Sequence, residues 1–194
     1  MVMDENAFNR GLLPHCDIVV AWLRGDLDEL PHHPAPPAAE TQLIIEDLVI
    51  INQAGLLTLN SQPGTDDQRA YLCVLTSPRV ARHLATAARS AGMLADHWPL
   101  AEPPQHRGPM LVTRGTSESR VTMPAGTRYQ DATGGPAVVT EQAECAAGAA
   151  RDVIELSDDP TLFAQGQLVN VVDPRWGPNE RLWGAVRDAI ASLP

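Results

Sequence analysis

The chain has 194 residues, of which 44% are apolar and 20% are charged. This balance can bury the core of an ordinary domain and excludes a disordered tail. Its 14 basic and 24 acidic side chains give a formal net charge of −10. The charge disfavours nucleic acid and anionic lipid surfaces as partners and suits a cationic ligand, although a pocket is needed to select one.

The cysteines and the amino terminus favour a cytoplasmic protein without a metal centre. The three cysteines lie far apart and form no Cys-x-x-Cys pair, so we expect each to be a small buried apolar side chain: Cys16, Cys73 and Cys145. The first ten residues lack a basic start followed by an apolar run, and no stretch approaches the roughly 18 apolar residues of a membrane span. We therefore expect a cytoplasmic location and no membrane partner.

The first 60 residues predict two helices and a strand. Residues 1–14 are expected to form a flexible N-terminus, ahead of a single domain over residues 15–194. From Asp17, apolar side chains recur at helical spacing, and the proline-rich PHHPAPPAA that follows predicts an extended connector that could line a site. ETQLIIEDLVIINQAG then predicts a mostly buried helix that ends at Gly55, and LLTLN predicts a strand.

The middle of the chain predicts a strand-helix-strand unit. AYLCVL is apolar throughout, Ser77 can cap the following helix with Pro78 in its first turn, and MLADHWPL is a weaker strand. Such a unit favours a mixed or parallel sheet covered by helices. MLVTR and SRVTM predict two short strands, residues 124–136 a long surface loop, and residues 140–156 a helix with Thr140 as its cap.

The carboxyl end predicts a buried strand, QLVNVVD, a turn and an amphipathic helix, ERLWGAVRDAIASL. Together the segments predict an α/β (mixed α+β) fold. Its central mixed β-sheet is flanked by helices, and the chain ends in a strand-helix unit.

Common catalytic motifs are absent from the sequence. It contains no G-x-G-x-x-G, no phosphate-binding G-x-x-x-x-G-K-[ST], no H-E-x-x-H and no G-x-S-x-G. His32 and His33 could offer imidazoles to a metal, but adjacent side chains diverge and no further ligand lies at the right spacing. We therefore identify no catalytic residue and expect no metal. The four tryptophans, among them Trp22, are expected to be core or hinge anchors, with stacking on a purine as the alternative.

Three blocks of the sequence resemble one known family. The first block covers residues 36–77 and contains, in order, PPAAET, an apolar helix, QAG, LLTLNSQPG and AYLCVLTS. The second block is the helix after Ser77 and the strand that ends at Trp98. The third block consists of QLVNVVD, a short turn and a helix that begins ERLW. These blocks resemble the S-adenosylmethionine-binding regulatory domain of methylenetetrahydrofolate reductase over most of residues 20–194. Standalone actinobacterial proteins also resemble the N-terminal half of this sequence.

The resemblance implies a ligand site. The family's domain binds S-adenosylmethionine or S-adenosylhomocysteine and reports methylation state to a catalytic barrel. By resemblance, the ligand-contacting positions are Glu40, Thr41, Thr58, Ser61, Thr113 and, more loosely, Thr122. Glu40 would face the cationic part of the ligand, and the threonine and serine hydroxyls would face its polar groups. Without the resemblance, Glu40 and Thr41 are a first-turn charge and a helix cap, and the threonines of the strands are ordinary β-branched residues.

The sequence therefore predicts a standalone binding protein for S-adenosylmethionine, S-adenosylhomocysteine or a related adenosyl metabolite. No reductase barrel, flavin signature or folate signature accompanies the domain, so its expected partner is a protein or catalytic subunit in trans, and a homodimer stays open. The first alternative is an enzyme on the same fold that transforms an adenosyl or amino-acid substrate, with Glu40 as its acid or base. The second is a ligand-free interaction module. With no catalytic constellation recognised, the prediction leans away from an enzyme.

Overall fold

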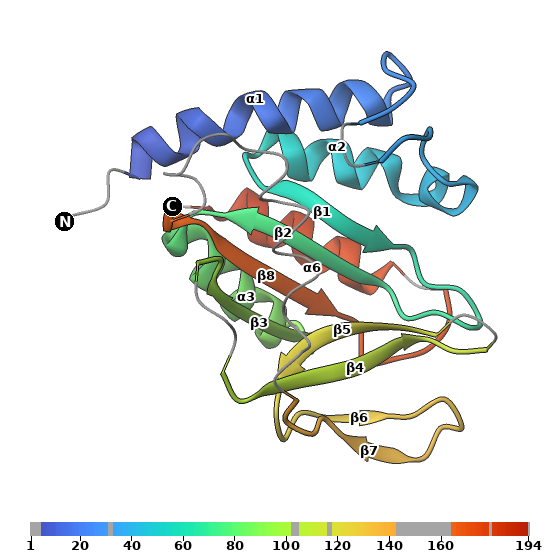
Figure 1. Cartoon of the computed structure of the whole chain (residues 1–194). Helices are drawn as coiled ribbons and strands as arrows, with labels where there is room; N and C mark the ends of the chain where they lie inside the picture. Colours follow the sequence, from blue (N-terminus) through green and yellow to red (C-terminus); the bar gives the residue numbers. More distant parts are fainter. Residues whose placement is uncertain are drawn as a thin grey trace.

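A four-stranded antiparallel sheet forms the centre of the fold (Figure 1). The computed structural model describes residues 5–30, 33–101, 105–115, 118–142, 164–178 and 180–193. The strands lie in the order β1–β2–β8–β3, with bounds β1 Leu57–Gln62, β2 Tyr71–Thr76, β8 Gln167–Val172 and β3 Leu94–Pro99. The predicted mixed α+β class, with a central sheet flanked by helices and a final strand-helix unit, is confirmed.

The helices lie along the β1 edge and behind the sheet in the view of Figure 1. Their bounds are α1 Glu5–Leu23, the 3₁₀ helix η1 Ala39–Ile44, α2 Ile45–Gln53, α3 Pro78–Ser90 and α6 Arg181–Ala191. α1 and α2 pack on each other and on β1, whereas α3 packs on β3, β8 and α6. Within the described residues, no helix is both long enough and apolar enough to cross a membrane.

Helix α3 begins as its sequence predicts. The Ser77 hydroxyl accepts a hydrogen bond from the backbone N–H of Val80 at 3.4 Å, and Pro78 occupies the first turn. A side-chain oxygen at this position satisfies one of the amides that a helix start leaves without a partner, and proline has no amide to lose. The helix buries Ala81, Leu84, Ala85 and Ala88 against the sheet.

The pairing of the strands differs from the mixed or parallel sheet that the strand-helix-strand unit favours. All hydrogen-bonded neighbours in the central sheet are antiparallel. β2 and β3 do run parallel to each other, as a crossover through α3 requires, but β8 lies between them and pairs with both. The local sequence does not indicate this insertion, because β8 lies far along the chain from both β2 and β3.

Helix α1 begins earlier than predicted. Residues 1–14 were expected to be flexible and the helix to start near Asp17, but α1 starts at Glu5 and contains Pro14. Phe8 and Leu12 are buried in the same core as Cys16 and Val19. Burial of this apolar stripe therefore holds the first turns of the helix in place despite a proline that removes one of its hydrogen bonds.

Two small sheets complete the described fold. β4 (Arg107–Thr113) pairs with β5 (Ser119–Pro124), and β6 (Arg128–Gln130) pairs with β7 (Pro136–Val138). A hairpin over residues 128–138 therefore occupies much of the stretch 124–136, where a long loop was expected, because three-residue strands are too short to show a period. Of the helix expected over residues 140–156, Thr140 to Gln142 are not helical and the remainder, with Cys145, lies outside the described residues. Cys16 and Cys73 are buried free thiols, as expected.

A buried arginine joins the small sheets to the turn after β8. Arg69, which is 0% exposed, donates from Nε to the carbonyl oxygen of Leu111 at 3.2 Å. Its two terminal nitrogens donate to the carbonyl oxygens of Gln130 and Pro174. The guanidinium carbon also lies 4.1 Å from the centre of the Trp176 ring. Burial is the main cause that lowers the pKa of Arg69 to about 10, so the side chain stays charged near neutral pH.

Candidate functional site

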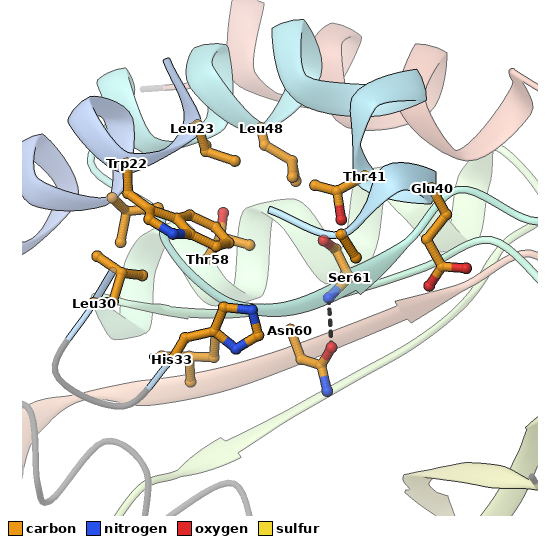
Figure 2. Close-up of a pocket in the computed structure, with 13 residues that line it drawn as sticks. Trp22, Leu23, Leu30, His33, Glu40, Thr41, Leu48, Thr58, Asn60 and Ser61 are labelled. Atoms are coloured by element: carbon orange, nitrogen blue, oxygen red, sulfur yellow. Dashed lines mark hydrogen bonds between the residues drawn. The ribbon is translucent and has the colours of Figure 1, made fainter. Parts of the chain in front are cut away.

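A cavity of about 360 Å³ lies between the end of α1, the proline-rich connector, η1 with the start of α2, and β1 (Figure 2). A volume of this size falls at the lower end of the roughly 300–1,000 Å³ that small-molecule sites occupy. Its walls come from segments spread over residues 19–61, which the packing of α1 and α2 on β1 brings together. The two ends of the cavity differ in chemistry.

The polar end carries four of the side chains that line the cavity: Glu40, Thr41, Asn60 and Ser61. Glu40 and Thr41 lie in the first turn of η1, and Asn60 and Ser61 lie on β1. The residue before η1 is Ala38, and no side chain caps the helix, so the alternative role of Thr41 as a cap is not taken. This end therefore presents one carboxylate, two hydroxyls and one amide, which suit a ligand rich in hydrogen-bond donors.

Thr58 lines the cavity and is held from behind by a buried asparagine. Asn52, at 0% exposure, donates from Nδ2 to the Leu48 carbonyl oxygen at 2.8 Å and to the Thr58 hydroxyl at 2.8 Å. The backbone N–H of Thr58 donates back to Asn52 Oδ1 at 3.1 Å. Because the Thr58 hydroxyl accepts here, its own proton is available to a group in the cavity.

Replacing Asn52 with leucine should therefore damage both the fold and the orientation of Thr58. The change leaves the backbone N–H of Thr58 without its acceptor, and we expect the free energy of unfolding to fall by about 1–3 kcal/mol. Urea unfolding followed by circular dichroism measures this loss. Gln53→Leu, at the exposed next position of α2, is the control and should change stability by less than about 0.5 kcal/mol; equal losses in the two variants would contradict the assigned role.

The opposite end of the cavity is apolar and aromatic. Trp22 and His33 meet edge to face, with ring centroids 5.1 Å apart and planes at 88°, and Leu23 and Leu30 lie beside them. The Trp22 indole N–H donates to the Ala35 carbonyl oxygen at 2.9 Å, which ties the connector to α1. A flat apolar group would find dispersion contacts and ring edges here.

Two predicted site residues do not line this cavity. Thr113 lies at the end of β4, where its hydroxyl donates to Gln62 Oε1 at 3.0 Å and accepts from the Ser119 hydroxyl at 2.6 Å. Thr122 is buried on β5, and its carbonyl oxygen accepts from Asn170 Nδ2 at 2.9 Å. The structure thus brings together Glu40, Thr41, Thr58 and Ser61 at the cavity and places Thr113 and Thr122 elsewhere.

Sequence reasoning missed several of the residues around the cavity. The connector was expected to be able to line a site, and its His33 does so. Asn52 lies on a helix that reads as apolar, and nothing in the local pattern shows that its amide faces Thr58. No group of three His, Cys, Asp or Glu side chains that could hold a metal ion occurs in the described part of the chain.

The fold and the cavity define a small α+β protein with a cavity of metabolite size among the described residues. The model of a family described as a domain of unknown function, DUF6919, matches residues 7–193. The chain belongs to this family, and the match includes every residue that lines the cavity.

Proposed function

We propose that this protein binds S-adenosylmethionine, S-adenosylhomocysteine or a related adenosyl metabolite in the cavity between α1, the connector, η1 and β1. The proposal carries forward the resemblance to the regulatory domain of methylenetetrahydrofolate reductase. One observation supports it above the rest: Glu40, Thr41, Thr58 and Ser61, singled out by that resemblance, line one cavity. η1 packs on β1, and these four residues lie where the two elements border the cavity.

The two ends of the cavity suit the two ends of such a ligand. An adenine ring would lie at the aromatic end, where Trp22 and His33 offer ring edges and Leu30 offers apolar surface. The ammonium or sulfonium would lie toward Glu40, and the ribose hydroxyls would meet the hydroxyls of Thr41, Thr58 or Ser61. None of the described lining residues is an arginine or a lysine, so a nucleotide with a chain of phosphates would meet no compensating charge.

The proposed role is that of a sensor. Binding in a cavity shared by α1, the connector and β1 would change the relative stability of their packing, and a protein partner or catalytic subunit in trans would respond to that change. A second copy of the chain is another partner to consider. We also propose a cytoplasmic location for the protein, because adenosyl metabolites are made and used there.

Thermal unfolding with added ligand tests the proposal. At a free concentration about 100 times the Kd, S-adenosylmethionine or S-adenosylhomocysteine should stabilise the native state by about 2.7 kcal/mol and raise Tm by several degrees. Glu40→Ala should abolish most of this shift, because it removes the carboxylate that faces the cationic part of the ligand. Differential scanning fluorimetry measures both proteins over a ligand series.

Glu46→Ala is the matched control, because Glu46 is also an exposed glutamate in the first turn of a helix but does not line the cavity. It should keep the full shift. An equal shift in wild type and Glu40→Ala would contradict the assignment, and no shift in the wild type would favour an interaction module without a ligand. Chromatography of the recovered ligand separates a sensor from an enzyme, because turnover would convert the ligand into a product.

A further inference from the structure

The carboxylate at the polar end of the cavity is held from outside its own helix. Among the described residues, the structure gives the exposed Glu40 side chain one hydrogen-bond donor, Gln68, whose Nε2 lies 3.3 Å from Glu40 Oε2. Gln68 lies in the turn between β1 and β2, 28 residues along the chain, and does not line the cavity. A glutamate in the first turn of a short 3₁₀ helix would otherwise sample many rotamers.

The backbone of Gln68 is a firm anchor for this contact. Its N–H donates to the Thr65 carbonyl oxygen at 2.9 Å, and its carbonyl oxygen accepts from the N–H of Thr65 at 3.2 Å. The N–H of Gly177 donates to the same oxygen at 3.3 Å, and Gln68 also forms a β-bridge with Thr113 of β4. The turn is thus tied both to β4 and to the loop after β8, which holds the backbone from which the Gln68 side chain reaches Glu40.

The orientation of the Gln68 amide follows from the carboxylate. Gln68 Oε1 is buried and accepts no hydrogen bond from the described residues. Exchanging the amide nitrogen and oxygen would set that oxygen against the Glu40 carboxylate, where two acceptors repel. The amide therefore donates to Glu40 while its oxygen accepts no hydrogen bond from the described residues.

We propose that Gln68 is the positioning residue for an ammonium-binding end of the cavity, so that the protein selects adenosyl compounds with an amino-acid tail over those without one. The inference rests on the proposed function and assigns its ligand class. Gln68 holds one oxygen of the Glu40 carboxylate, which leaves the other oxygen oriented toward an ammonium group. Because the carboxylate is fixed before the ligand arrives, the ordering cost on binding is reduced.

Isothermal titration calorimetry with two probes tests this inference. S-adenosylhomocysteine carries the amino-acid tail, and 5′-methylthioadenosine shares its adenosine and thioether but lacks the tail. Wild type should bind the first more tightly. Gln68→Leu should weaken S-adenosylhomocysteine binding by about tenfold, as expected for the loss of one charge-assisted contact, and should leave 5′-methylthioadenosine binding within about twofold of wild type.

Two further variants keep the test decisive. Gln68→Asn retains an amide but draws it back by one methylene, and it should show the same selective loss if Gln68→Leu does not fold. Gln53→Leu, at an exposed position that does not line the cavity, should bind both probes like wild type. Equal weakening of both probes, or no weakening of either, would overturn the role of Gln68 alone. A wild type that binds neither probe would overturn the proposed function and this inference together.

Discussion

Replacement of Arg69 by methionine is expected to lower the free energy of unfolding by about 3 kcal/mol or more. Methionine keeps much of the aliphatic volume but removes the donors that reach the carbonyl oxygens of Leu111, Gln130 and Pro174. These oxygens belong to β4, β6 and the turn after β8, so one side chain satisfies acceptors from three separate segments. The bond to Leu111 is buried, and an acceptor left unpaired there costs about 1–3 kcal/mol; the bonds to Gln130 and Pro174 are partly buried and add smaller losses.

Urea unfolding at neutral pH measures this loss, and Arg82→Met is the control. Arg82 is an exposed arginine on α3, and its replacement should change stability by less than about 0.5 kcal/mol. The spectroscopy can also separate local from global damage, because Trp176 lies against Arg69 and should become more exposed in the variant. A stability change in Arg69→Met no larger than that of the control would show that the three carbonyl groups find other partners.

The second large effect is an alkaline loss of stability that comes from two buried thiols. Burial, with a smaller effect from the charge of Asp17, raises the pKa of Cys16 from 9.0 to about 12. Burial raises the pKa of Cys73 from 9.0 to about 12. In the unfolded chain each thiol loses its proton near pH 9, whereas in the folded protein it keeps the proton. The unfolded state therefore binds fewer protons between about pH 9 and 12, and stability falls as the pH rises through this window.

Between pH 8 and pH 10 the expected loss is about 1.4 kcal/mol for each thiol and about 3 kcal/mol for the pair. Urea unfolding in the presence of a reductant measures it. Comparison with the Cys16→Ala, Cys73→Ala double variant isolates the thiols, since that variant should lose correspondingly less over the same range. The range stops at pH 10 because burial raises the pKa of Tyr71 above its usual value and lowers that of Arg69 to about 10. Parallel curves for the two proteins would contradict this account.

Local signals predicted some elements of the fold accurately. Ser77 with Pro78 marks the start of α3, and the apolar run at residues 167–172 predicts β8, because caps and periods act within a few residues. The start of α1 was missed because Gly11 and Pro14 disfavour a helix locally, whereas burial of Phe8 and Leu12 favours it through tertiary contacts. The position of β8 depends on partners far away in the chain, which no local pattern encodes.

In the candidate site too, some residues could be predicted from the sequence and others depend on contacts between distant segments. Glu40, Thr41, Thr58 and Ser61 were identified through blocks of sequence that resemble a known family, and they line one cavity; whether they bind the expected ligand stays a prediction. Gln68 could not be found in this way, because its relation to Glu40 is a contact between a turn and a helix 28 residues apart. Thr113 is connected to Gln62 and Ser119 and forms a bridge with Gln68, so its links to the cavity are indirect.

The central position of β8 has a consequence for the order in which the protein can be assembled during synthesis. β2 and β3 leave the ribosome with a gap between them that only residues 167–172 fill. Until that segment emerges, a nascent chain can pair β1 with β2 but cannot join either to β3, and both inner edges remain open to other strands. Closure of the core therefore waits for the last part of the described chain, and contacts this distant in sequence favour slow folding.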